Sequence, residues 1–303
     1  MIIDAHCHIW ERQLMTGDFG RSLDSAVRVL GLQNEESILN GSIERLIGEM
    51  DAAGIDKTVI LPIDFEFLYS EENFSYRDYN NLAGDYLKRF PDRIIAFAGV
   101  DPRRGTSAVD ELRRCVEEMG FRGLKLWTVT GFVPDDEAYY PLYEEAARLG
   151  ITILVHTGAG PGTTYMRTCQ PVFVDKLAVD FPKTNFIMAH MGMPWVEEAM
   201  AVAFKNPNVY MDVSAWQRMA AISPLEFPRV LSQAKLGLMG VQKILFGSDW
   251  PLFTEIYSQK AWVEVIRGME YPAPLQMMGL PELTAEDKEM ILGRNAERVL
   301  GLS

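Results

Sequence analysis

Two of the chain's four histidines lie one residue apart near its beginning, in the segment MIIDAHCHIW. The apolar residues Ile2 and Ile3 lead into the pair, so the segment is typical of a buried β-strand. Because side chains alternate between the two faces of a strand, His6 and His8 are expected to point the same way and Cys7 the other way. Two imidazoles on one face can share a ligand, and the first chemistry to consider is metal binding.

The other two histidines and one carboxylate also follow short apolar runs. His156 ends the run ITILVH, His190 ends NFIMAH, and Asp249 follows the apolar residues of KILFGSDWP. Imidazole and carboxylate ligands without a thiolate suit Zn²⁺, with Mn²⁺ and Fe²⁺ as further candidates. These residues can act together only if the fold brings the ends of their apolar runs to one place.

The elements that would position them alternate along the whole chain. Strand-like segments lie at 2–8, 57–63, 93–100, 123–127, 151–156, 185–190, 209–213 and 243–246. Amphipathic, helix-like segments lie at 42–53, 77–90, 107–119, 138–149, 171–181, 194–205, 228–236 and 258–267. Eight βα units in a chain of this length predict a (β/α)8 TIM barrel. A doubly wound open sheet is the alternative, but no GxGxxG turn follows the first strand.

We expect a single domain over residues 1–303, without a linker or a change in composition. An irregular stretch at 9–41 is predicted to be a long loop after the first strand, suited to covering a site. Residues 284–303 are predicted to be a C-terminal helix, with Thr284 as its N-cap.

In such a barrel the carboxyl ends of all strands meet on one face, where active sites form. We therefore expect His6, His8, His156 and Asp249 to be ligands of one ion, with a position left for water or substrate. His190 is then either a ligand to a second ion or a general acid–base group beside the first.

The net charge and the number of cysteines argue against several classes of partner and site. The formal net charge of −13 argues against nucleic acids and anionic membrane surfaces. The three scattered cysteines suggest neither disulfides nor a structural zinc cage. No apolar run approaches the ~18 residues of a membrane span, and no signal-like segment precedes the first strand, so a cytoplasmic protein is expected. Whether it forms a homo-oligomer stays open.

The sequence around these residues resembles that of the amidohydrolase superfamily. The resemblance runs along the chain through DAHCH, GVDPR, GLKLW, AHMGMPW, NPNVYMDVSA, GSDWP and ILGRNAERVLGL. It is strongest for the amidohydrolase-related branch, which includes aminocarboxymuconate-semialdehyde decarboxylase and related non-oxidative decarboxylases. The resemblance implies a distorted barrel, a divalent metal held by His6, His8, His156 and Asp249, and a catalytic role for His190.

Two further charged residues lie in the predicted strands. Binuclear members of the superfamily bridge two ions with a carboxylated lysine on the fourth strand, and Lys125 is in about the right place. Alternatively, Lys125 sits deeper and pairs with a carboxylate inside the barrel, and one ion per chain is the preferred expectation. Asp4 is expected on the same face as His6, where it either orients a ligand imidazole or bonds to the barrel floor.

Two reactions fit this ligand set. The first is hydrolysis of a small organic amide, ester or lactone by a water that the metal activates. The second is non-oxidative decarboxylation of an aromatic or muconate-like acid, with Asp249 or His190 delivering a proton to carbon. A barrel that binds metal and ligand without catalysis is a third possibility.

Aromatic and basic residues near the strand ends bear on the substrate. Five of the six tryptophans either pack the barrel rim or wall a cleft for a planar or apolar molecule: Trp10, Trp127, Trp195, Trp216 and Trp250. Arg167 and Arg218 follow the fifth and seventh strands and either grip a substrate carboxylate or lie on the surface. We expect a small substrate that is planar or carries a carboxylate.

Overall fold

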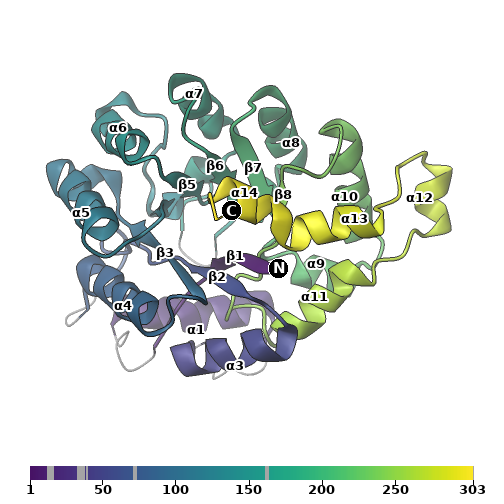
Figure 1. Ribbon diagram of the computed structural model, residues 1–303, viewed down its shortest axis with the longest axis horizontal. Helices are drawn as coiled ribbons and strands as arrows, with labels where there is room; N and C mark the ends of the chain where they lie inside the picture. Colours follow the sequence, from purple (N-terminus) through teal and green to yellow (C-terminus); the bar gives the residue numbers. More distant parts are fainter. Residues whose placement is uncertain (12–16, 33–37, 39, 71–73, 161–163, 303) are drawn as a thin grey trace.

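Eight parallel strands follow one another in sequence order around a barrel in the computed structural model of the chain (Figure 1). The structure describes residues 1–11, 17–32, 38, 40–70, 74–160 and 164–302. The strands are β1 (Ile3–Cys7), β2 (Lys57–Ile60), β3 (Ile94–Gly99), β4 (Gly123–Leu126), β5 (Thr152–Val155), β6 (Phe186–Met188), β7 (Val209–Asp212) and β8 (Ile244–Leu245). The (β/α)8 barrel predicted from the sequence is confirmed.

Helices surround the strands (Figure 1). They are α1 (Asp18–Leu30), α3 (Ile43–Ala53), α4 (Tyr76–Arg89), α5 (Thr106–Glu117), α6 (Tyr140–Leu149), α7 (Val172–Asp180), α8 (Val196–Lys205), α9 (Gln217–Ile222), α10 (Glu226–Gly237), α11 (Gln259–Arg267), α12 (Ala273–Met277), α13 (Ala285–Glu289) and α14 (Asn295–Val299). Within the described part of the chain, none of them combines the length and apolar character that a membrane crossing requires.

Local signals fix where several helices begin. The Ser42 side chain accepts a hydrogen bond from the Arg45 amide at the start of α3. Thr284 and Asp287 form a reciprocal capping box at the start of α13, as the N-cap prediction requires. A π-helical turn at Met290–Arg294 joins α13 to α14.

The barrel closes irregularly between its last and first strands. The backbone amides of Ala5 and His8 donate to the carbonyls of Phe246 and Trp250, at 2.9 and 2.7 Å. Between them lies Gly247, where a Cβ would stand 3.0 Å from His6 Cβ. A side chain at this glycine would therefore push β8 away from β1, which bears the first histidine pair.

A C-terminal helix covers the amino ends of the strands. The Val299 carbonyl accepts hydrogen bonds from Thr152 Oγ1 and Asn185 Nδ2, both at 3.1 Å. Ala296 and Val299 of α14 pack into the apolar cluster that fills the barrel interior. This end of the barrel is thus sealed, and the opposite end, at the carboxyl ends of the strands, is left to carry a site.

Part of the predicted loop at 9–41 is helical. Helix α1 occupies Asp18–Leu30, and Gly31 ends it with a left-handed backbone at φ 69°. Phe19 and Val27, eight residues apart, are both buried, which is the spacing of one helix face. The sequence prediction missed this helix because no capping side chain marks its beginning.

The prediction that Asp4 shares a face with His6 was wrong, because β1 contains an irregularity. The register of β1 against β2 shifts between Asp4 and Cys7. Across this bulge the alternation of faces is broken, so Asp4 and His6 lie on different faces. Asp4 accepts hydrogen bonds from Gln259 Nε2 of α11 at 3.1 Å and from the amides of His6 and Ser248 at 3.1 and 3.0 Å. It joins β1 to the end of β8 and α11, and it orients no imidazole.

Candidate functional site

Three of the four predicted metal ligands, His6, His8 and Asp249, bring donor atoms within 4.8 Å of one another at the carboxyl end of the barrel, and His156 lies at the same end outside this close group. His6 lies near the end of β1, His8 follows β1, His156 follows β5 and Asp249 lies beyond β8. All four are buried, with residue exposures of 7% or less. Because the strands are parallel, their carboxyl ends lie on one face, and side chains far apart in the sequence meet there.

Asp249 lies within reach of the first-strand pair. Its Oδ1 is 3.5 Å from His6 Nε2 and 3.4 Å from His8 Nε2. These separations exceed good hydrogen bonds, but two ligands of one tetrahedral ion at about 2.0–2.2 Å from it stand roughly 3.3–3.6 Å apart. The spacing of these three donors therefore fits a single shared cation.

Hydrogen bonds on the far side of each ring fix which nitrogen faces the cation position. His8 Nδ1 lies 2.8 Å from the Leu61 carbonyl, and His6 Nδ1 lies 2.9 Å from Asp212 Oδ2. Both acceptors require a hydrogen on Nδ1, which leaves the Nε2 lone pair free towards Asp249. This is the tautomer that a metal ligand needs.

His156 offers a further nitrogen that suits a metal ion. Its Nε2 is buried and has no hydrogen-bond partner among the described residues. Burial, and then the neighbouring His190, hold the pKa of His156 well below its usual range. An unpartnered, neutral imidazole nitrogen is costly to bury in an apolar setting and suits a metal ligand. The residues present thus fit a divalent ion.

The sequence analysis missed Asp212, which organises the group from the end of β7. Its Oδ2 accepts from His6 Nδ1, and its Oδ1 accepts from the backbone amides of His190 and Ser214, both at 3.0 Å. The signal was present, since Asp212 ends an apolar run in NPNVYMDVSA just as the histidines end theirs. Because these donors already engage it, the close group of His6, His190 and Asp212 needs no second ion.

A chain of hydrogen bonds links Asp212 to His156. The Ser214 hydroxyl donates to Asp212 Oδ1, so it can only accept from His190 Nδ1, 2.7 Å away. His190 Nε2 then lacks a hydrogen and lies 3.4 Å from His156 Nδ1. The chain assigns a hydrogen to His156 Nδ1 and leaves its unpartnered Nε2 as a lone-pair donor.

Lys125 lies inside the barrel against this group. It belongs to β4, is 1% exposed, and places its Nζ 3.3 Å from His6 Nε2. Burial lowers its pKa to about 8. Burial raises the pKa of Asp249, but the neighbouring imidazoles, His8 foremost, together act in the opposite direction, so the net shift is downward and the carboxylate stays ionised.

The backbone is left-handed at two of these positions. His190 has φ 58° and Asp249 has φ 53°. Residues other than glycine adopt such backbone angles at a cost of roughly 1–3 kcal/mol, and residues with such angles cluster at functional sites. The turns after β6 and β8 aim both side chains at the same space.

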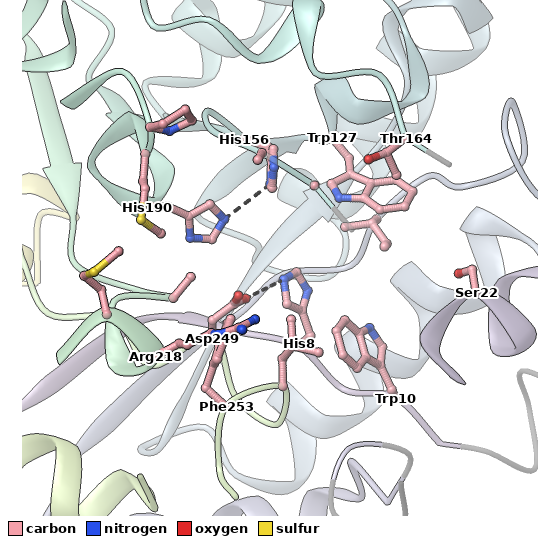
Figure 2. A pocket seen from close by; sticks show the side chains of 18 of the residues that line it. His8, Trp10, Ser22, Trp127, His156, Thr164, His190, Arg218, Asp249 and Phe253 are labelled. Carbon is pink, nitrogen blue, oxygen red and sulfur yellow. Dashed lines mark hydrogen bonds and ion pairs between the residues drawn. The ribbon is translucent and has the colours of Figure 1, made fainter. Parts of the chain in front are cut away.

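The group opens into a cavity of about 550 Å³ (Figure 2). His8, His156, His190 and Asp249 lie close together on its wall, with Trp10 and Trp127 to one side of them. The other lining side chains are mainly apolar and aromatic: Trp10, Phe19, Ile63, Tyr69, Trp127, Met193, Pro194, Met219, Ile222, Leu252 and Phe253. Such a cavity, apolar with a few convergent polar groups, is typical of a small-molecule site.

The structure brings some of the predicted substrate residues together and leaves others apart. Trp10, Trp127 and Arg218 line the cavity. Trp216 is buried behind it, where its Nε1 donates to the His190 carbonyl at 3.0 Å. Trp250 donates to Glu49 Oε2 at 3.1 Å.

The other two predicted substrate residues lie elsewhere. Trp195 lines a separate hollow with Glu198 and Arg229. Arg167 is exposed, in a short 3₁₀ turn before α7.

The chain is similar in sequence to known decarboxylases. The chain is 22% identical over 336 aligned residues to 2-amino-3-carboxymuconate-6-semialdehyde decarboxylase of Dictyostelium discoideum, covering 99% of this chain and 84% of that protein. It is 26% identical to gamma-resorcylate decarboxylase of Rhizobium sp. (strain MTP-10005), over 70% of this chain and 77% of the relative.

Solved structures with the same fold include dihydroxybenzoic acid decarboxylase from Polaromonas sp. JS666, which contains manganese and the inhibitor 2-nitroresorcinol. The match has a TM-score of 0.67 and 19% identity, and it covers 99% of this chain and 97% of that one. The family described as Amidohydrolase matches residues 3–302. The chain therefore belongs to the amidohydrolase family, as the resemblance of its strand-end motifs indicates.

Proposed function

We propose that this protein is a metal-dependent carboxy-lyase that removes CO₂ without oxidation from an aromatic hydroxy acid. Of the two reactions expected from the sequence, this was the alternative and hydrolysis the first. The similar proteins named above support the alternative, since they are decarboxylases by name, and one solved neighbour holds manganese with an aromatic inhibitor.

The observation that carries the proposal is a group of donor side chains on the wall of a mainly apolar, aromatic cavity. A planar ring packs well between such walls. A carboxylate held among them is poorly solvated, whereas the CO₂ that forms from it is neutral. The apolar walls therefore accept the neutral CO₂ readily, whereas the charge of the substrate has to be held by the donor group.

One divalent ion per chain, Mn²⁺ or Zn²⁺ with Fe²⁺ as a further candidate, would be held by His6, His8, His156 and Asp249. When bound, such an ion supplies a Lewis acid that attracts the carboxylate and the neighbouring hydroxyl oxygen of the substrate. Lys125, with its amine against His6, stays an uncarboxylated neighbour in this proposal and bridges no second ion.

The chain's own residues move the proton. The ionised Asp249 carboxylate takes the proton of the substrate hydroxyl and returns it to the ring carbon that bears the carboxylate. The bond from this carbon to the carboxylate then breaks, CO₂ leaves, and the electron pair returns through the ring to the hydroxyl oxygen. His190 lines the cavity beside Asp249 and is placed to contact the departing group. Arg218, on the same cavity, is placed to attract the incoming anion.

The test is a direct assay of both reactions. Protein loaded with Mn²⁺ or Zn²⁺ is incubated with 2,6-dihydroxybenzoate and other hydroxybenzoates, and separately with lactones and amides. We expect CO₂ from a hydroxybenzoate, dependence on added metal after chelation, and no CO₂ from the Asp249→Asn variant. Hydrolysis of a lactone or amide without CO₂ from any acid would overturn the proposal.

A further inference from the structure

We infer that the cavity contains a distal subsite, walled by Trp10, Phe19, Tyr69 and Trp127, that binds a second aromatic ring of the substrate. The inference rests on the proposed function for the acid end of the molecule. It names a bicyclic or aryl-extended hydroxy acid as the substrate class, in place of a single ring.

The size of the cavity is the first argument. An apolar cavity of about 150 Å³ is enough to bind one benzene molecule. The cavity here is about 550 Å³. A single-ring acid held at the histidines and Asp249 leaves most of this space to water against apolar walls, which is unfavourable.

The position of the aromatic side chains is the second argument. Trp10 stacks on His8, with ring centroids 5.1 Å apart and an interplanar angle of 11°. Phe19 of α1 continues from it, 6.4 Å from the Trp10 ring and 6.0 Å from the Trp127 ring. The wall thus begins one ring beyond the metal ligand and leads away from it, on the side of His8 opposite Asp249 (Figure 2).

The orientation of the rings favours an aromatic guest. Phe19 meets Trp127 at 88° and Trp10 at 79°, while Tyr69 is tilted by 39° against Trp127. The wall is therefore a cluster of rings that already contact one another at several angles, and a further aromatic ring can add to it through offset or edge-to-face contact.

The polar side chains near this wall are Ser22, Thr164 and Tyr69, none of which is a carboxylate or a cation. The Ser22 hydroxyl lines the cavity but donates to the Phe19 carbonyl at 2.6 Å. The charged lining residues are Arg218 and the group at the metal end, among the described residues. An uncharged ring suits the distal wall, and a second carboxylate there would lack a cationic partner.

The experiment compares two probes that differ by one ring. Protein loaded with Mn²⁺ is titrated calorimetrically with 2-hydroxybenzoate and with 1-hydroxy-2-naphthoate. We expect the naphthoate to bind about tenfold more tightly or better, since the second ring buries additional apolar surface. In the Trp127→Ala variant, the ratio of the two dissociation constants is expected to fall to within a factor of two.

Two further variants control this result. Trp127→Leu keeps an apolar side chain and guards against misfolding, and it should give an intermediate ratio. Trp195→Ala removes a tryptophan outside the cavity and should leave the ratio unchanged. Equal binding of the two acids to the native protein, or an unchanged ratio in both Trp127 variants, would overturn the inference.

A parallel CO₂ assay separates the subsite from the reaction. Tighter naphthoate binding that depends on Trp127 supports the subsite even if neither acid releases CO₂, in which case only the proposed reaction fails. Release of CO₂ from 2-hydroxybenzoate without any preference for the naphthoate overturns the subsite and leaves the reaction standing.

Discussion

Two buried polar clusters lie at the same end of the barrel and differ in how well their atoms are partnered. Beyond β2 and β3, Asp64 accepts two hydrogen bonds from Arg104, at 2.5 and 2.8 Å, and Asp101 accepts two from Arg103, at 2.8 and 2.6 Å. The Asp101 amide donates to Asp64, and Thr130 Oγ1 donates to Asp101, each at 2.9 Å. Each carboxylate in this arginine cluster is matched by a cation.

The histidine cluster beyond β1, β5, β6 and β8 is matched only on its outer side. Towards its centre, Asp249 stands 3.4–3.5 Å from two imidazoles, and His156 Nε2 has no partner in the described structure. Buried polar atoms are normally satisfied, so the second cluster is incomplete without a ligand. Burial and polarity alone therefore do not mark a site, whereas convergent donors without partners do.

The most damaging change should be Asp249→Asn, because it removes both a ligand and the proton carrier. We expect kcat/KM for decarboxylation to fall by about a thousandfold and the metal content of the purified protein to drop well below one ion per chain. Metal analysis and a CO₂ assay measure the two effects. Asp101→Asn, in the arginine cluster, is the matched control and should keep its metal.

Arg104→Ala should lower the stability of the fold and leave metal binding intact. It leaves the buried Asp64 carboxylate without its cation, which costs roughly 3 kcal/mol. Urea unfolding measures this loss, and the folded fraction should still bind one metal ion per chain. A variant with unchanged stability but lost metal would show that the two clusters are not independent.

Asp212→Asn should weaken the site without emptying it. The amide keeps an acceptor for the His190 backbone but can no longer attract the Nδ1 hydrogen of His6 as a carboxylate does. We expect metal affinity to fall by about 10- to 100-fold, as for other changes behind a ligand. Competition against a chelator of known affinity gives this value, and an unchanged affinity would contradict the role assigned to Asp212.

Ser214→Ala should have the smallest effect. It removes the acceptor for His190 Nδ1 and costs about 1 kcal/mol, or about fivefold in rate. Because Asp212 still holds His6, metal affinity should change by less than the rate does. A larger loss of metal than of kcat would place Ser214 with the ligands instead.

The barrel and the meeting of these side chains at one end of it were predictable because topology alone brings strand ends together. His156, His190 and Asp249 each end or follow an apolar run, and parallel strands bring such ends together on one face. Asp212 carried the same signal and could have been found in the same way. Asp4 could not be placed, because a bulge in β1 leaves no mark in the residue pattern.

The direction in which the tryptophan side chains point could not be predicted. Trp216 and Trp250 both follow residues with a left-handed backbone, Ala215 at φ 64° and Asp249 at φ 53°. In each turn the first residue faces the cavity and the tryptophan after it faces the helices. The sequence shows which residues follow a strand. The direction of a side chain in a turn depends on backbone angles, which the sequence does not show.

The left-handed backbone at Asp249 also bears on how this protein can diverge. Asp, Asn and His tolerate φ near 53° better than other residues with side chains, whereas Glu, the other carboxylate donor, carries a backbone cost of about 1 kcal/mol or more there. His6 lies within β1 and His8 directly after it, and neither has a left-handed backbone, so no such restriction applies to them. A lineage that alters its metal preference should therefore exchange a histidine of the first strand before it exchanges the carboxylate after the last.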